Sequence, residues 1–326
     1  MKRIIGIGNA LVDVLIKLES DHFLDEYNIP KGSMQLVDKD FVKLLTIVTN
    51  SIQPQLASGG SASNTIHGLA RLGVQTSYIG KIGNDDFGKI FSEDLKKNNI
   101  SPILFYSNDE TGRAITFISP DSERTFATYL GAAVELNADD LNPAQFDGYD
   151  LLHLEGYLVF NHDLVERALK IAKGKGMLIS IDLASYNVVD SNKDFLQRII
   201  KEYVDIVFAN EDEAKSLTGL EPEWALRAIA RLCEIVVVKF GAKGSAVKRG
   251  NELARASAIK ANAVDTTGAG DLYASGFLYG LINGWTLDKC VKFGSITAGK
   301  VVETIGAKIN DQGWKEIIAL MEPFKN

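Results

Sequence analysis

The sequence lacks the features that mark several large classes of protein. Its 326 residues include two cysteines, Cys233 and Cys290, and carry a formal net charge of −7. Two cysteines cannot build a disulfide framework or a metal-ligand cluster, and we expect both to be ordinary buried residues. The mild acidity indicates no basic face, so nucleic acid is not expected as a partner.

Long hydrophobic runs are also missing, so no segment is expected to span a membrane. Residues 1–7 faintly imitate a signal peptide, but Asn9 and Asp13 interrupt the apolar run and no small-residue cleavage site follows. We therefore expect a cytoplasmic protein. The length and the near-average composition allow one large α/β domain, or two smaller ones, with a full hydrophobic core.

The most informative stretch that is present is D-T-T-G-A-G-D, Asp265 to Asp271, which predicts a loop running into a helix. The small residues Gly268, Ala269 and Gly270 leave backbone N–H groups open to an anion at the positive end of the helix dipole. Asp271 follows directly, should be ionised at neutral pH, and can accept a proton. An anion site beside a proton acceptor suits phosphoryl transfer to a hydroxyl group.

The tripeptide alone would favour an ordinary helix start, where glycine and a first-turn aspartate are common. The whole run favours a functional site, because a plain cap does not need two glycines around an alanine and carboxylates on both sides.

Near the N-terminus, residues 4–7 predict a buried strand that ends in Gly8-Asn9. A dinucleotide-binding loop is not expected, because Leu11 replaces the third glycine and strand-like residues 12–16 replace the helix. Asp13 projects to the opposite face from its apolar neighbours. It is either a solvated strand residue or a carboxylate that binds substrate hydroxyls, and we favour the second.

A second small-residue segment, Ser58 to Asn64, leads into a predicted helix. Its glycines, Gly59 and Gly60, let a ligand approach the backbone, and Asn64 can donate and accept hydrogen bonds. Alone, Asn64 reads as a helix-start residue. Together with the glycines and Asp13 it favours substrate binding.

The second half of the chain alternates strand-like and helix-like segments, which predicts a parallel sheet covered by helices on both faces. The predicted strands are 151–154, 177–182, 204–208 and 235–239. Chemistry-bearing residues should lie at the carboxyl ends of such strands. Residues at these ends are Tyr157, Asp182, Asn210 and Lys239.

Three other segments are informative. Asn210 and Glu213 form a possible capping box at a helix start, which does not exclude a further role. Residues 239–247 predict a hairpin in which Gly241 and Gly244 let the backbone lie against a ligand. Residues 103–128 are strand-like with no helix between, so they should leave the main sheet, and Arg124 within them is most simply a solvated hairpin residue.

Taken together, these motifs resemble the ribokinase-like (PfkB) family of sugar and nucleoside kinases, with both signatures in order along nearly the whole chain. The resemblance implies a single α/β domain over residues 1–326, with a mostly parallel central sheet, helices on both faces and a small β lid. The lid would come from about residues 13–37 and 103–130.

The resemblance also implies roles for individual residues. Asp271 would be the catalytic base, and Gly268, Ala269 and Gly270 would form the anion hole. The substrate would contact Asn9, Asp13, Gly59, Gly60, Ser61, Asn64, Tyr157 and Arg124. ATP would contact Asn210, Glu213, Lys239, Gly241 and Gly244. Mg²⁺ would bind Glu213 through water, and K⁺ or another monovalent cation would bind Asp265 and Thr267.

The implied reaction is ATP- and Mg²⁺-dependent transfer of the γ-phosphate to a primary hydroxyl of a sugar or nucleoside, by a monomer or homodimer. Ser61 stands where ribokinases have a lysine, and G-N-A-L-V-D and G-G-S-x-x-N are closer to adenosine kinases, as is an aromatic at Tyr157. The alternatives are a ribokinase- or fructokinase-type enzyme and an inactive nucleotide-binding protein.

Overall fold

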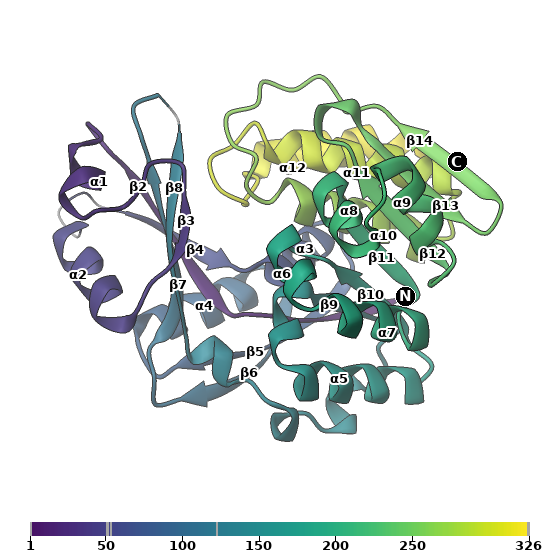
Figure 1. Ribbon diagram of the computed structural model, residues 1–326, viewed down its shortest axis with the longest axis horizontal. Coiled ribbons are helices and arrows are strands. Elements are labelled where there is room, and N and C mark those ends of the chain that lie inside the picture. Colours follow the sequence, from purple (N-terminus) through teal and green to yellow (C-terminus); the bar gives the residue numbers. More distant parts are fainter. Residues whose placement is uncertain (1, 50–51, 53, 122, 325–326) are drawn as a thin grey trace.

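The computed structural model describes residues 2–49, 52, 54–121 and 123–324. The chain forms a nine-stranded sheet with the order β14-β13-β12-β11-β10-β9-β1-β5-β6 and a five-stranded sheet with the order β3-β8-β7-β2-β4 (Figure 1). No described helix is long and apolar enough to cross a bilayer.

The large sheet is mostly parallel, as predicted. Every neighbouring pair from β6 to β12 is parallel, and β13 and β14 add an antiparallel edge. Its strands are β1 (Arg3–Ile7), β5 (Gln75–Gly83), β6 (Ile100–Ser107), β9 (Leu151–Glu155), β10 (Leu178–Asp182), β11 (Ile206–Asn210), β12 (Ile235–Lys239), β13 (Ser245–Arg249) and β14 (Glu252–Ala256).

Helices cover both faces of this sheet because successive strand residues point to opposite sides. In β1, Ile5 and Ile7 join one core cluster and Ile4 joins the other. The first cluster includes side chains from α5 (His162–Gly174), α6 (Tyr186–Ser191), α7 (Lys193–Glu202), α8 (Glu211–Thr218) and α9 (Pro222–Ile229). The second includes side chains from α3 (Ser61–Arg71), α4 (Asp86–Lys97), α10 (Ala269–Ile282) and α11 (Leu287–Val301).

The remaining helices are shorter or peripheral. Helix α12 (Asp311–Met321) packs with α10 and α11 in a third cluster. Short 3₁₀ helices are η2 (Ala132–Glu135), η3 (Ala138–Asp140), η4 (Pro143–Phe146), η5 (Gly156–Phe160), η6 (Gly241–Lys243) and η7 (Glu322–Phe324).

The five-stranded sheet stands at one side of the large one (Figure 1). It consists of β2 (Leu11–Lys17), β3 (Met34–Leu36), β4 (Gln55–Gly59), β7 (Thr111–Ile118) and β8 (Arg124–Gly131), with α1 (His22–Glu26) and α2 (Lys39–Thr49) beside it. The β7–β8 hairpin confirms the one predicted from the turn at residues 120–123.

The bounds predicted for this second sheet were wrong at two places. Residues 103–107 belong to β6, which pairs with β5 in the large sheet, and β4 joins the second sheet although it was not assigned to it. The lack of a helix within residues 103–128 indicated that the chain changes from one sheet to the other, but it did not indicate after which strand the change occurs. Whether the second sheet closes over a substrate stays a prediction.

The sheet order also fixes where a ligand can lie. In the large sheet, β1 lies between β5, the next strand of this sheet along the chain, and β9, which follows later. Ligands bind open α/β sheets at the carboxyl ends of the strands where the order reverses in this way. Asp182, Asn210 and Lys239 are the last residues of β10, β11 and β12, and Tyr157 lies in η5, just beyond β9.

Two helices meet very closely below this edge. A Cβ atom on Gly68 of α3 would lie 2.7 Å from the Cβ of Ser275 and 2.9 Å from a methyl group of Leu272, both on α10. A glycine is therefore required for α3 and α10 to pack at this distance. These are the helices that carry Ser61, Asn64 and Asp271.

We predict that Gly68→Ala lowers the free energy of unfolding by about 1–3 kcal/mol, because the added methyl group overpacks the α3–α10 contact. Denaturation in urea measures the change. The matched control is Gly174→Ala at the end of α5, where a Cβ would meet nothing within 4 Å. That variant should be neutral or slightly more stable, and an equal loss in both variants would contradict the packing argument.

Candidate active site

The D-T-T-G-A-G-D stretch forms the predicted loop and helix start. Gly268 is the residue before α10 and has φ 75°, a left-handed conformation that favours glycine. A Cβ at Gly268 would also lie 2.5 Å from the Cβ of Ala307. The turn therefore needs glycine for its own geometry, and it places Asp271 in the first turn of the helix.

Asp271 is held by residues that lie more than 200 positions away in the sequence. The Ser61 hydroxyl donates to Oδ1 of Asp271 at 2.7 Å, and the Asn64 amide donates to Oδ2 at 3.0 Å. The Thr65 hydroxyl donates to the Asp271 backbone carbonyl at 3.1 Å. The first turns of α3 and α10 are thus joined through one carboxylate.

The surroundings tune the acidity of Asp271. Burial raises the pKa of this carboxyl group from 3.8 to about 6, although the hydrogen bonds from Ser61 and Asn64 lower it. Near neutral pH the carboxylate is mostly ionised, yet it binds a proton far more readily than an exposed aspartate. This is the acidity that suits a general base.

The predicted anion site is reduced by one donor. The N–H of Ala269 donates to the Thr266 carbonyl at 3.1 Å, whereas no hydrogen bond from the N–H of Gly268 or Gly270 occurs within the described residues. A Cβ on Gly270 would lie 3.0 Å from the Nζ atom of Lys239. An anion at this helix start would therefore find two N–H groups and an ammonium group nearby.

Asp13 and Gly59 lie side by side on the neighbouring strands β2 and β4 of the second sheet. Asp13 is paired with Ala57 in the β2–β4 register, and a Cβ on Gly59 would lie 2.6 Å from Oδ2 of Asp13. Gly60 has φ 89° and faces the Asn9 carbonyl. Burial raises the pKa of Asp13 to about 6, Lys308 lowers it, and the Asp271 carboxylate raises it further. Both carboxylates therefore belong to one electrostatic site.

Glu155 was not among the predicted site residues, although it lies at the centre. Its Oε1 accepts from the Asn9 side chain at 2.7 Å and from the Asn9 backbone at 3.3 Å, while Oε2 accepts from the Ala62 N–H at 3.0 Å. Burial raises the pKa of Glu155 to about 7 despite these hydrogen bonds. The sequence did contain a sign of this role, because Glu155 is a charged residue that directly follows the predicted apolar strand 151–154.

The groups predicted to contact ATP lie at and just beyond the ends of β11 and β12. Lys239 pairs with Asp182 at 2.9 Å. Burial alone would lower the pKa of Lys239, but the surrounding carboxylates of Asp182, Glu213 and Asp271 raise it overall. The ammonium group is therefore firmly protonated at the point where β12 approaches the start of α10.

Asn210 and Glu213 form the predicted capping box. The Asn210 backbone and side chain donate to the two Glu213 carboxylate oxygens at 2.8 and 2.7 Å, and the Glu213 N–H donates back at 2.8 Å. Because both oxygens already accept hydrogen bonds, these residues fit Mg²⁺ bound through water better than direct coordination. No group of three His, Cys, Asp or Glu side chains suited to a metal ion occurs among the described residues.

Arg124 reaches from the second sheet to the loop before α10, where it forms an ion pair with Asp265. The Asp265 carboxylate also accepts from the N–H groups of Thr267 at 2.7 Å and Gly306 at 2.6 Å. A guanidinium group and two N–H donors surround this carboxylate, so the arrangement does not fit a monovalent cation at Asp265 and Thr267.

The backbone conformation of the β12–β13 turn explains the presence of its two glycines without a ligand. Gly241 has φ 54° and Gly244 has φ 99°, and a Cβ at Gly244 would collide with the Ala256 carbonyl. Tyr157 is half-buried against the core, and burial raises its pKa to about 12. Contacts of these residues with nucleotide or substrate stay predictions.

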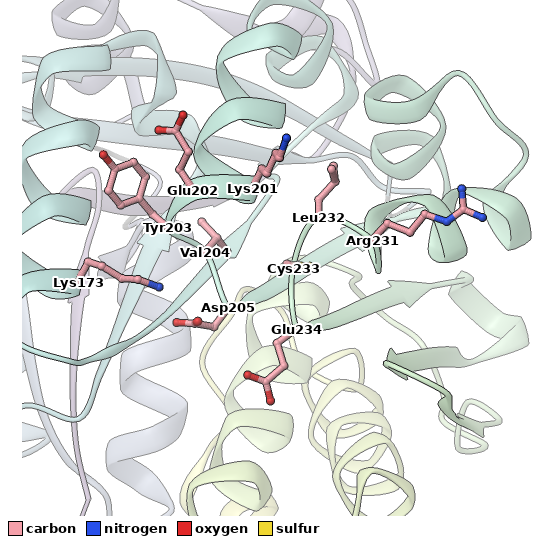
Figure 2. Close-up of a pocket in the computed structure, with 10 residues that line it drawn as sticks. All are labelled: Lys173, Lys201, Glu202, Tyr203, Val204, Asp205, Arg231, Leu232, Cys233 and Glu234. Carbon is pink, nitrogen blue, oxygen red and sulfur yellow. The ribbon is translucent and has the colours of Figure 1, made fainter.

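A separate hollow of about 320 Å³ lies at the opposite edge of the large sheet, where β11 and β12 begin (Figure 2). Its lining includes Lys173, Lys201, Arg231, Glu202, Asp205, Cys233 and Glu234. The charges are of both signs, and burial raises the pKa of the Cys233 thiol to about 12, so this thiol is not a reactive thiolate. The hollow is not part of the candidate site.

Comparison with known proteins shows the family and the fold of this chain. Residues 38–312 match the profile described as pfkB family carbohydrate kinase. Two solved structures are each 34% identical and cover 98% of this chain: a probable sugar kinase from Rhizobium etli, over 98% of its length with TM-score 0.88, and an adenosine kinase from Sinorhizobium meliloti, over 99% with TM-score 0.87.

Two curated relatives differ in their stated substrates. A nucleoside kinase of Methanocaldococcus jannaschii is 31% identical over 274 residues, which is 82% of this chain and 86% of that protein. A 5-dehydro-2-deoxygluconokinase of Clostridium perfringens is 30% identical over 264 residues, 75% of this chain and 78% of that protein.

The raised pKa of Asp271 predicts a pH-dependent stability difference. Since its pKa rises from 3.8 to about 6 on folding, the folded state binds the proton more tightly, and stability falls as the pH rises through this window. We therefore expect the free energy of unfolding of Asp271→Asn to increase relative to that of the wild type as the pH rises over that range. The pH-dependent gain should be on the order of 2 kcal/mol, since a pKa unit is worth about 1.4 kcal/mol and residual exposure screens part of it.

Urea denaturation of both proteins between about pH 4 and about pH 8 measures this difference. Asp288→Asn is the matched control, because Asp288 lies in the first turn of α11 and is exposed. A stability difference between Asp271→Asn and the wild type that stays constant with pH would contradict the assigned environment of Asp271.

Proposed function

This chain belongs to the pfkB family of carbohydrate kinases, and we propose that it phosphorylates a primary hydroxyl group of a nucleoside, adenosine first among them, with ATP as the donor. The family makes the protein a phosphotransferase acting on a sugar or nucleoside. One observation carries the proposal: a proton-accepting carboxylate, Asp271, lies beside open N–H groups at the start of α10.

In the proposed reaction, Asp271 accepts the proton of the acceptor hydroxyl. The oxygen forms a bond to the γ-phosphorus of ATP, and the bond between that phosphorus and the oxygen bridging to the β-phosphate breaks, which releases ADP. The N–H groups of Gly268 and Gly270 and the ammonium group of Lys239 stabilise the charge on the transferring phosphoryl group. Mg²⁺, when bound, supplies further charge neutralisation on the phosphates.

The acceptor is proposed to bind between the two sheets. Asp13 and Asn9 offer a carboxylate and an amide to its hydroxyl groups, and Gly59 and Gly60 leave room for close approach. Ser61 and Asn64 hold the Asp271 carboxylate through their hydrogen bonds. The Oδ1 of Asn64 is buried and has no hydrogen-bond partner within the described residues, so an acceptor hydroxyl can donate to it.

ATP is proposed to lie along the ends of β11 and β12. Asn210 and Glu213 would organise the phosphates and their Mg²⁺ through water, and Lys239 would reach the phosphates from the end of β12. The turn containing Gly241 and Gly244 would lie against the nucleotide. These groups surround the start of α10 from one side, and the acceptor residues surround it from the other.

Adenosine is favoured over a free sugar by three observations. Ser61, a neutral side chain, follows the di-glycine where ribokinases have a lysine. Tyr157 lies beside Glu155 and Asp182 and offers an aromatic face for a purine. The relatives include the Sinorhizobium meliloti adenosine kinase and the Methanocaldococcus jannaschii nucleoside kinase.

A sugar or sugar acid is the second candidate, because the relatives also include the Clostridium perfringens 5-dehydro-2-deoxygluconokinase and the Rhizobium etli probable sugar kinase. The catalytic groups would be the same in both cases. The two candidates would differ in the group that the acceptor places against Tyr157.

The test is ADP release with ATP and, in turn, adenosine, ribose, fructose and 5-dehydro-2-deoxygluconate. We predict the highest kcat/KM for adenosine. Tyr157→Ala should raise the KM for adenosine roughly tenfold, because stacking on a base is worth about 1–3 kcal/mol. Tyr106→Ala, at an exposed position on β6, is the control and should leave the KM unchanged.

If ribose, fructose or 5-dehydro-2-deoxygluconate gives the highest kcat/KM, the nucleoside assignment is wrong and the family membership stands. Equal losses with Tyr157→Ala for adenosine and ribose would also contradict stacking on a base.

A further inference from the structure

Lys308 places a buried ammonium group inside the candidate site without a hydrogen bond. The residue follows Gly306 and Ala307 in the segment between α11 and α12, and its Nζ atom is buried with no hydrogen-bond partner among the described residues. A buried charge without partners is costly unless nearby opposite charges compensate for it. The surroundings of Lys308 must therefore supply that compensation.

The two residues before Lys308 lie against the loop before α10. A Cβ on Gly268 would lie 2.5 Å from the Cβ of Ala307, and the Gly306 N–H donates to Asp265 at 2.6 Å.

The charged groups that face this ammonium come from four elements. The carboxylates of Asp13 (β2), Asp94 (α4) and Asp271 (α10) interact electrostatically with the ammonium, as does His67 (α3). Burial lowers the pKa of His67 well below its usual value, and Lys308 and Arg71 lower it further, so the ring is neutral near neutral pH.

The other cations near the site are already engaged. Lys239 pairs with Asp182 at 2.9 Å, and Arg124 pairs with Asp265. Asp94 accepts hydrogen bonds from the Ser58 side chain and from Asn98. Lys308 is thus the described cation that faces Asp13 and Asp271 together.

We propose that Lys308 is a positioning residue for the phosphoryl transfer, whose buried ammonium is the counter-charge that lets Asp13 and Asp271 carry negative charge side by side. The inference rests on the proposed function, because it assumes that Asp271 accepts the proton. Lys308 acts through the two carboxylates and does not itself touch the reacting atoms.

The electrostatics agree with this geometry. Burial raises the pKa of Asp13, Lys308 lowers it, and Asp271 raises it. The pKa of Lys308 is lowered overall, because burial lowers it more than Asp94, Asp13 and Asp271 raise it. Without the ammonium, one of the two carboxylates would take up a proton near neutral pH. Either the proton acceptor or the acceptor-binding carboxylate would then be lost.

The experiment is the pH dependence of kcat/KM between about pH 5 and about pH 9, with ATP and whichever of the four acceptors above is preferred. We expect Lys308→Met to move the acidic limb upward by about one pH unit, the shift typical of removing one nearby opposite charge. Its activity should recover toward that of the wild type as the pH rises. Lys308→Arg keeps the charge and should keep the wild-type limb.

Lys300→Met is the matched control, because Lys300 is a partly buried lysine of α11 that pairs with Glu303 and Glu316. Its acidic limb should not move. A Lys308→Met variant whose kcat/KM falls equally at every pH, with an unmoved limb, overturns the proposal. If Asp271→Asn keeps near-wild-type activity, the assignment of Asp271 as proton acceptor is wrong. If Asp271→Asn is inactive but the acidic limb of the Lys308→Met pH profile does not move, only the role of Lys308 is rejected.

Thermal melting provides a second measurement if Lys308→Met folds poorly. The double variant Asp13→Asn/Lys308→Met removes one charge of each sign, so it should recover most of the melting temperature lost by Lys308→Met. A double variant that melts as low as Lys308→Met contradicts the charge pairing.

Discussion

The hydrogen bonds from Ser61 and Asn64 to the Asp271 carboxylate are the contacts on which the rest of the site depends. They join the starts of two helices from opposite ends of the chain, and this is possible because Gly68 lets α3 and α10 approach closely. The glycine before α10 turns the chain so that the carboxylate lies at the helix start. Local backbone geometry and long-range packing thus meet at one side chain.

The same arrangement of helices and strands places several carboxyl groups in a buried region. Burial raises the pKa values of Asp13 and Asp271 to about 6 and that of Glu155 to about 7. Such groups destabilise the fold at neutral pH, as active sites often do. Hydrogen bonds from Asn9 and Ala62 offset the cost of burying the Glu155 carboxylate. Lys308 and Lys239 do the same for Asp13 and Asp271 through their positive charge. A proton acceptor of useful acidity follows from this balance.

Much of the fold could be predicted from the sequence because strand and helix periodicity are local. The predicted strand 235–239 matches β12, and Asp182 and Asn210 lie at strand ends as expected. Glu155 and Lys308 were missed because their importance comes from burial beside distant residues, which no local pattern records. The Arg124–Asp265 ion pair was missed for the same reason, and it argues against the predicted cation site. The predicted limits of the second sheet were wrong because β6 and β7 follow one another in the chain and have similar composition, yet belong to different sheets.

The most direct test of Asp271 as the base is the turnover of Asp271→Asn, compared with its affinity for ATP. The substitution keeps the size and hydrogen-bonding capacity of the side chain but removes the proton acceptor. If Asp271 is the base, kcat falls by about 10²–10⁴-fold while the Kd for ATP stays close to that of the wild type. A variant with near-wild-type kcat would contradict the assignment of Asp271 as the base.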